Sequence, residues 1–234
     1  MPKNRKVLCV VTSNGTKGSS GIPTGLWLSE LTHPVSQFRK HGIDFEIVSI
    51  KGGTPPIDPA SISVKDEINE EFMNNPSLLE MFNNTRSIDK VKSSDYVAVL
   101  YSGGHGPMWD FPNNPFIHTI TREIYENGGI VSAICHGPCA LFNVQLSNTD
   151  YLIKGKKLVS FTNNEEIEAQ FTDIVPFLLQ TALSNHQAIF QEKPNWSDNV
   201  IVDGNLITGQ NPQSALDLGE VLSQAVLNNI KAEL

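Results

Sequence analysis

The chain contains one stretch that decides its fold and points to its chemistry, GGIVSAICHGP (Gly128–Pro138). Its apolar part, Ile130–Ile134, is short and uninterrupted, as in a parallel strand that is buried on both faces. The strand ends at Cys135, and His136 and Gly137 follow directly. A sharp turn between a strand and a helix exposes a nucleophile to substrate and surrounds it with backbone N–H groups. The stretch therefore suggests a reactive thiol, although an inert cysteine packed at a strand end fits these residues equally well.

Three more apolar runs of the same kind alternate with helical patterns. The apolar residues of Thr24–His41 recur on one side of a helix, which Pro34 is expected to kink or restart. A second helix is expected within Pro112–Gly129, ended by its glycines. This alternation predicts an α/β fold in which helices pack on a doubly wound, mostly parallel sheet. The three further strands are expected at Val7–Val11, Phe45–Ile50 and Tyr96–Tyr101.

The rest of the sequence predicts an inserted lobe and further elements of the same domain. Residues 52–91 contain a proline-rich segment and then a polar, asparagine-rich one, and they predict a small, partly helical insertion. Asp203-Gly204, between two β-rich arms, is a clear hairpin signal. The whole chain, residues 1–234, is expected to form one domain. Further elements are expected at Lys157–Phe161 (a short strand), Glu165–Leu183 (a helix broken or restarted at Pro176), Val200–Thr208 (the hairpin) and Ser214–Ile230 (a helix).

Composition and charge exclude several classes of partner. The 234 residues include 39% hydrophobic residues, enough for a sizeable core, and carry a formal net charge of -8. An acidic chain lacks the basic surface that nucleic acid or an anionic membrane calls for, so a small molecule or a protein is the expected partner. Three cysteines without a metal-binding pair suit a reducing compartment and predict a cytoplasmic protein.

A glycine-rich stretch, YSGGHGP (Tyr101–Pro107), lies at the end of another expected strand. Ligands bind at the carboxyl edge of a parallel sheet, where the amides of Gly103 and Gly104 can approach a developing oxyanion. Alone, this stretch is also compatible with a simple tight turn. Paired with Cys135 at the end of a neighbouring strand, it predicts an oxyanion site. The dipole of a helix after Cys135 would favour the thiolate.

Acidic side chains are the candidate proton carriers. Glu30 lies in a largely apolar helix, and its burial would favour the neutral form, which suits a proton donor or acceptor beside a thiolate. The alternative is a solvated helix glutamate. Glu165 and Glu166 follow a strand end, where a carboxylate can orient an imidazole or simply stabilise a helix N-terminus. His136 reaches the adjacent Cys135 only if the turn is strained, and is otherwise a surface histidine.

The sequence predicts no metal and no cofactor. Glu30 and His33 have the spacing of a Glu-x-x-His metal pattern. One such pair without partners is a weak signal, and Pro34 disturbs the helix that carries it.

Four motifs follow one another along the chain: ELTHP (Glu30–Pro34), GGHG (Gly103–Gly106) with Trp109-Asp110, AICHGP (Ala133–Pro138), and GQNP (Gly209–Pro212) with Ser214-Ala215. Together they resemble the ThiJ/PfpI superfamily, most closely its heat-shock protein 31-like branch of glyoxalase III enzymes. The likeness spans nearly the whole chain. It implies a flavodoxin-like sandwich, of the kind found in class I glutamine amidotransferases, with a small inserted lobe and usually a homodimer. It also implies a catalytic site of Cys135, His136 and Glu166, or Glu165 in place of Glu166, with Glu30 next to the cysteine.

The resemblance also implies a function. Members are described as glutathione-independent glyoxalases that convert methylglyoxal to lactate, as deglycases, as stress-linked holding chaperones and, in some branches, as peptidases. We therefore expect a lyase of the glyoxalase III (D-lactate dehydratase) type, in which Cys135 attacks the aldehyde and Glu30 or His136 relays a proton. The alternatives are a hydrolase (peptidase or deglycase), a chaperone that binds unfolded client proteins, and a redox sensor that uses Cys135. The substrate and oxyanion pocket is expected to comprise Gly103, Gly104, His105 and Gly137.

Overall fold

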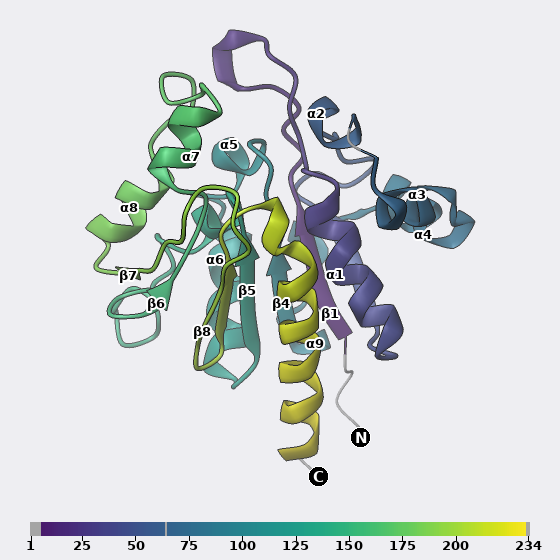
Figure 1. Ribbon diagram of the computed structural model, residues 1–234. Helices are drawn as coiled ribbons and strands as arrows, with labels where there is room; N and C mark the ends of the chain where they lie inside the picture. The colour runs from purple at the N-terminus through teal and green to yellow at the C-terminus, as the bar shows by residue number, and fades with distance from the viewer. Residues whose placement is uncertain (1–5, 64, 233–234) are drawn as a thin grey trace.

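A central sheet of seven strands, most of them parallel, organises the protein (Figure 1). The structure, a computed structural model, describes residues 6–63 and 65–232. The strands are β1 (Lys6–Val11), β2 (Phe45–Ser49), β3 (Arg86–Ser87), β4 (Tyr96–Tyr101), β5 (Ile130–Ile134), β8 (Val200–Asp203) and β9 (Leu206–Gly209). They lie in the order β3-β2-β1-β4-β5-β9-β8, and in this sheet β8 pairs antiparallel with β9. The order β2-β1-β4-β5-β9 is that of flavodoxin-like proteins, which confirms the predicted fold class.

Helices cover both faces of the sheet because alternate strand residues point to opposite sides. Cys9 packs in a core with α1 (Ser29–Lys40) and α9 (Ala215–Ala232), whereas its neighbour Leu8 packs in a second core with α6 (Pro115–Glu126). Figure 1 shows α1 and α9 side by side in front of the sheet and α6 behind it. The predicted sandwich of helices around a sheet is confirmed.

Helix α1 differs from the prediction at both its start and its proline. It begins at Ser29 rather than near Thr24, and it continues through Pro34 without a restart. Proline has no N–H to donate, so the carbonyl of Glu30, four residues earlier, loses its helical partner. The hydroxyl of Ser102 donates to this carbonyl at 3.1 Å. A side chain from the loop after β4 thus satisfies the group that Pro34 leaves without its helical hydrogen bond.

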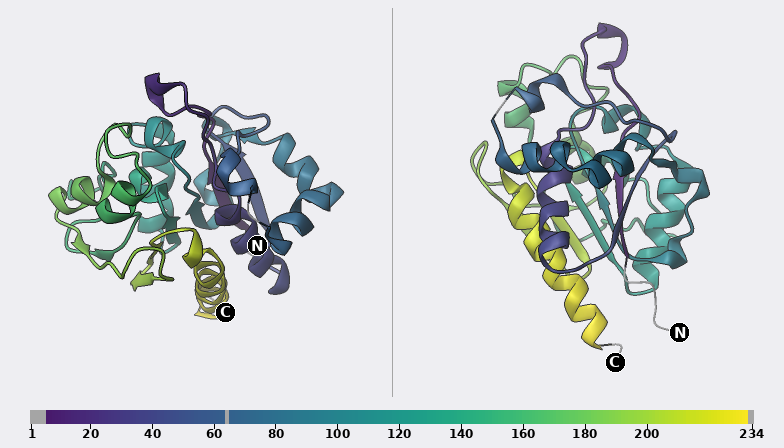
Figure 2. Two further views of the ribbon diagram at one scale, coloured as in Figure 1. Left: turned by 45° about the horizontal axis from the view of Figure 1, so that its top comes forward. Right: turned by 90° about the vertical axis from the view of Figure 1, so that its right-hand side faces the viewer.

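The inserted region, residues 52–91, is helical in part, as its composition predicts. It contains α2 (Pro59–Ile62), α3 (Glu67–Asn74) and α4 (Pro76–Asn83). Helix α3 packs beside α1, so this region lies along the same side of the sheet (Figure 2). The organisation of residues 1–234 as one domain stays a prediction.

The C-terminal half confirms the hairpin and corrects two other elements. The helix predicted over Glu165–Leu183 is broken around Pro176, as expected, but the break is longer, because residues 169–178 between α7 (Asn163–Glu168) and α8 (Leu179–Asn185) form no helix. The strand predicted at Lys157–Phe161 is only β6 (Lys157–Leu158), which pairs with β7 (Ile189–Phe190) in a separate two-stranded sheet. Among the helices of the described residues, none is long and apolar enough to cross a lipid bilayer.

Candidate active site

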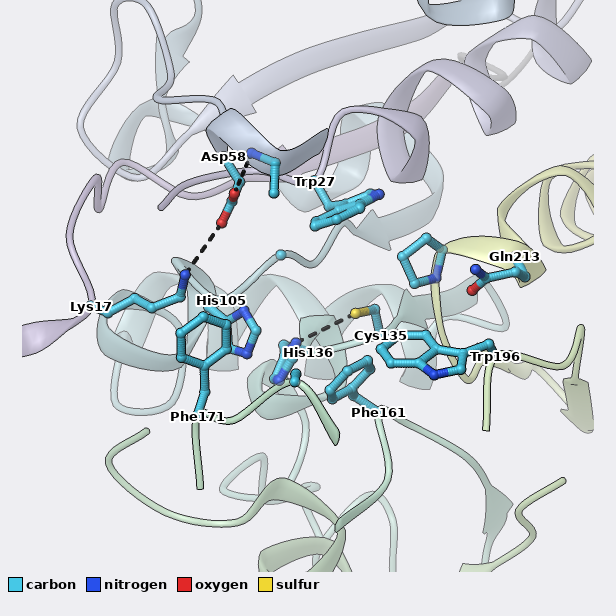
Figure 3. Close-up of a pocket in the computed structure, with 14 residues that line it drawn as sticks. Lys17, Trp27, Asp58, His105, Cys135, His136, Phe161, Phe171, Trp196 and Gln213 are labelled. Atoms are coloured by element: carbon cyan, nitrogen blue, oxygen red, sulfur yellow. Dashed lines mark hydrogen bonds and ion pairs between the residues drawn. The ribbon is translucent and has the colours of Figure 1, made fainter. Parts of the chain in front are cut away.

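A pocket of about 280 Å³ lies at the carboxyl ends of β4 and β5 (Figure 3). Cys135 follows β5, His105 lies in the loop after β4, and both line this pocket. The chain reverses its direction of winding between β1 and β4, and the carboxyl edge at such a switch point is where α/β sheets bind ligands. The position of the pocket therefore follows from the topology of the sheet.

Cys135 lies on a strained turn, the condition under which the side chain of the adjacent His136 can reach the thiol. Its φ of 58° is left-handed, a conformation that costs a residue with a side chain about 1–3 kcal/mol. The turn brings Sγ to 3.4 Å from Nδ1 of His136. Gly137 is needed next, because a Cβ there would lie 2.1 Å from the carbonyl oxygen of Tyr101. Cys135 is only 3% exposed, so a substrate must enter the pocket to reach the sulfur.

The electrostatic surroundings of Cys135 differ from the prediction. Only a short 3-10 turn, Gly137–Ala140, follows the cysteine, and four residues cannot provide the expected helix dipole. Burial, and then the nearby Glu30 carboxylate, raise the pKa of the Cys135 thiol well above its ordinary value. The resting sulfur is therefore a thiol, and it must pass its proton to a neighbour as it attacks.

Glu166 holds His136 from its other ring nitrogen. Oε2 accepts from Nε2 of His136 at 2.7 Å, and Oε1 accepts from Nε2 of His105 at 2.8 Å. Burial alone would raise the pKa of Glu166, but the charge of a protonated His136 and the hydrogen bonds from both rings hold it well below its ordinary value. An ionised carboxylate only accepts, so both Nε2 atoms carry a proton. When His136 is neutral, its Nδ1 is then free to accept the thiol proton.

Glu165, the other candidate for this role, points elsewhere. It forms a capping box with Thr162 at the start of α7, and its Oε1 accepts from Nδ2 of Asn211 at 2.8 Å. The structure therefore brings Glu166, and not Glu165, to His136.

The variant Glu166→Gln is expected to lower kcat/KM about thirtyfold. The amide of glutamine can accept a hydrogen bond from only one of the two imidazole rings, and it changes the tautomer of His136 that faces the sulfur. The matched variant Glu165→Gln removes charge from a structural cap, and should lower Tm while activity per folded molecule stays within about twofold. Initial rates and thermal unfolding of both variants check this pair. A large loss of activity in Glu165→Gln with little loss in Glu166→Gln would instead identify Glu165 as the carboxylate that supports His136.

Glu30 is fully buried beside the thiol. Its Oε2 accepts the N–H of Gly103 at 2.9 Å, while Oε1 has no hydrogen-bond partner within residues 6–63 and 65–232. Burial raises the pKa of Glu30 to about 8, against the opposing effect of hydrogen bonds from Cys135 and the glycine loop. An oxygen without a partner in a dry site is the natural place for a proton from the thiol. Nδ1 of a neutral His136 thus offers the sulfur one proton acceptor, and Glu30 offers a second once its carboxyl is ionised, above about pH 8.

The glycine loop differs in part from its predicted oxyanion role. The N–H of Gly103 is used by Glu30, and a Cβ at Gly103 would lie 2.5 Å from Oε2 of that carboxyl. Gly104, at φ 84°, offers its N–H to both the Cys135 sulfur and the Glu30 carboxyl, and is the remaining oxyanion candidate of the loop. His105 uses its side chain to bind Glu166 rather than an oxyanion. Burial, and then the charge of a protonated His136, lower the pKa of His105 to about 4, so this ring is neutral near pH 7.

Two charged residues of the pocket have no signal in the sequence that could have revealed them. Lys17, in the loop after β1, and Asp58, in the inserted region, come together as a buried ion pair, with Nζ 3.7 Å from Oδ2. They belong to none of the four motifs and are 41 residues apart in the chain. Only the folding of their two loops over the same sheet edge brings them together.

Within the described residues, His105, His136 and Glu166 could also offer a metal ion one donor atom each, with these atoms all within 4.8 Å of one another. A metal there would replace the two hydrogen bonds of Glu166. Glu30 and His33, which have the Glu-x-x-His spacing, do not face a common metal site. His33 binds Asp66 at 2.8 Å, while Glu30 faces Cys135.

Known proteins share both the sequence pattern and the fold. The profile of the DJ-1/PfpI family matches residues 22–225, so the chain belongs to this family, as its motifs predict. Glyoxalase 3 of Candida albicans is 33% identical, over 92% of this chain and 95% of its own length. The crystal structure of glyoxalase III from Candida albicans superposes with a TM-score of 0.87 at 32% identity and covers 94% of this chain and 96% of its own.

Two further relatives extend this group. The glutathione-independent glyoxalase HSP31 of Saccharomyces cerevisiae is 32% identical, over 90% of this chain and 93% of its own length. The structure of Rapid Encystment Protein 24 KDa from Francisella tularensis superposes with a TM-score of 0.92 at 42% identity, and covers 94% of this chain and 98% of its own.

Proposed function

We propose that this protein is a glutathione-independent glyoxalase that converts methylglyoxal, a small reactive aldehyde, to lactate. One observation carries the proposal: Cys135 lies on a strained turn in the pocket, with Glu30 on one side and Nδ1 of His136 on another. A buried thiol with proton acceptors at hand can form the hemithioacetal that other glyoxalases make with glutathione. The relatives that are named as glyoxalases support this choice.

The first step joins the sulfur to the aldehyde carbon. As the S–C bond forms, the thiol proton passes to Glu30 or to Nδ1 of His136, and from there to the aldehyde oxygen, which completes a hemithioacetal. The N–H of Gly104 lies on the sulfur side of the pocket, where it can stabilise the developing oxyanion.

The second step moves hydrogen between the two carbons of the substrate. The same base removes the proton from the hemithioacetal carbon to form an enediol, and a proton returns to the neighbouring carbon. One carbon is thereby oxidised to a thioester and the other is reduced to an alcohol, so no external oxidant is needed. Water then cleaves the thioester, releasing lactate and restoring the thiol. The net addition of water corresponds to the reverse of a lactate dehydratase, a lyase.

A direct test supplies the purified protein with methylglyoxal in a buffer free of thiols and measures lactate with a stereospecific assay. We expect one lactate enantiomer to form at a rate proportional to enzyme, with no increase on adding glutathione. Lactate that appears only with glutathione, or no lactate at all, would overturn the proposal.

The other expected properties stay predictions. A peptidase or deglycase would use the same thiol on an amide or a glycated side chain, and a redox sensor would oxidise it. Holding of unfolded clients depends on exposed apolar surface and should survive the loss of the thiol. The three cysteines are all free, which suits the predicted cytoplasmic location. A homodimer is expected in solution.

A further inference from the structure

Lys17 is a buried ammonium group that the proposed chemistry of the sulfur does not use. The residue is only 4% exposed and lines the same pocket as Cys135. Figure 3 shows its side chain reaching from the pocket wall towards Asp58, with His105 and Phe171 close by. A buried lysine normally has its charge matched by an acid and its N–H groups matched by acceptors.

The protein meets only part of this requirement. The carboxylate of Asp58 lies 3.7 Å from Nζ, which is longer than a hydrogen bond. Both oxygens of Asp58 are already engaged, Oδ2 by the hydroxyl of Thr24 at 2.8 Å and Oδ1 by the N–H of Ala60 at 3.0 Å. The ring of Phe171 lies 4.0 Å below Nζ and can accept no conventional hydrogen bond. Among the described residues, Lys17 Nζ therefore has a counter-charge but no hydrogen-bond acceptor.

We propose that Lys17 binds a carboxylate carried by the substrate, so that the preferred substrates are 2-oxoaldehydes with an acidic end rather than methylglyoxal itself. This inference rests on the proposed glyoxalase function. The oxoaldehyde group would react at Cys135, and the carboxylate would accept hydrogen bonds from Nζ elsewhere in the same pocket. The pocket, at about 280 Å³, has room for more than the three carbons of methylglyoxal.

The charges around Lys17 favour a carboxylate over a phosphate. Asp58 lines the pocket, and the ionised Glu166 is hydrogen-bonded to two further lining residues, His105 and His136, so two negative charges already lie at or next to the pocket. The ammonium of Lys17, which is paired only with Asp58 at 3.7 Å, can bind one further negative charge. A doubly charged phosphate would be repelled more strongly by both acids. Lys17 is thus expected to act on substrate selection and not on the chemical step.

The test compares two substrates of the same length, 4,5-dioxopentanoate, which ends in a carboxylate, and 2-oxopentanal, which ends in a methyl group. We expect wild-type kcat/KM to be about tenfold higher for the acid, the value of one charge-assisted hydrogen bond. Lys17→Met should remove this preference and leave kcat/KM for 2-oxopentanal within about twofold. Lys17→Arg should retain part of it. The control Lys92→Met removes an exposed charge just before β4, at the amino ends of the strands and away from the pocket. It should change kcat/KM for neither substrate.

A binding measurement separates this inference from the proposed activity. Calorimetric titration with 2-hydroxyglutarate and with 2-hydroxypentanoate, the expected products of the two substrates, requires no turnover. Tighter binding of the diacid that disappears in Lys17→Met would support the carboxylate site even if neither aldehyde were converted. Equal kcat/KM for the two aldehydes in the wild type, or a preference that survives in folded Lys17→Met, would overturn the inference while leaving the glyoxalase proposal intact.

Discussion

Replacing Cys135 by alanine is expected to lower kcat/KM for methylglyoxal at least about a thousandfold, because the sulfur forms the bond that carries the substrate through every later step. Glu30 and His136 remain in the variant, but neither then has a thiol to deprotonate. The oxygen of the substrate keeps only the N–H of Gly104 as a donor. Initial rates of lactate formation at several methylglyoxal concentrations measure the loss.

Cys139 provides the matched control for this variant. It lies in the same turn, is fully buried, and donates its S–H to the carbonyl of Pro107 at 3.4 Å, away from the proton acceptors at Cys135. Cys139→Ala removes one buried sulfur and should cost roughly 1 kcal/mol of stability while kcat/KM stays within about threefold. Equal losses in the two variants would show that the turn, and not the Cys135 sulfur, carries the activity.

Replacing Glu30 by glutamine is expected to lower kcat about three-hundredfold with little change in KM, within the range that positioned acids and bases contribute. Glutamine keeps the shape of the side chain, and its carbonyl oxygen can still accept the N–H of Gly103, so the glycine loop stays in place. The amide cannot take a proton from the thiol, and His136 is left as the acceptor. A rise in KM at unchanged kcat would instead assign Glu30 to substrate binding.

The pH dependence of the wild type reports on the same pair of groups. The pKa of Glu30 is raised to about 8 and that of Cys135 lies well above its ordinary value, so below pH 8 the pair holds two protons and above pH 8 it holds one. Only the form that has lost a proton contains the Glu30 carboxylate, the second acceptor beside His136. We therefore expect kcat/KM to rise with pH through about 8. In Glu30→Gln this rise should move to higher pH, where the thiol alone ionises. A rise that stays near pH 8 in the variant would attribute it to another group.

The sequence by itself determined the sheet and the location of the chemistry. Uninterrupted apolar runs need burial on both faces, so they predict parallel strands whose carboxyl ends meet at one edge. Cys135 and the glycine loop each directly follow such a run, and their proximity is therefore a consequence of strand order. The helix predicted after Glu165 breaks around Pro176, as expected from the missing N–H of proline, but residues 169–178 form no helix, so the break is longer than the sequence indicates.

Only the tertiary structure decided which groups meet within the site. Glu165 and Glu166 are neighbours in sequence with the same chemistry, and the cap of α7 determines that one binds Asn211 while the other binds His136. Likewise, the burial of Cys135 and then the nearby Glu30 raise the pKa of the thiol, whereas the local sequence suggests a helix dipole that would lower it. The sequence likewise gives no sign that Lys17 and Asp58 meet in the pocket. Hydrogen bonds and charge pairs act over a few ångströms in space, and loops that are distant along the chain supply them.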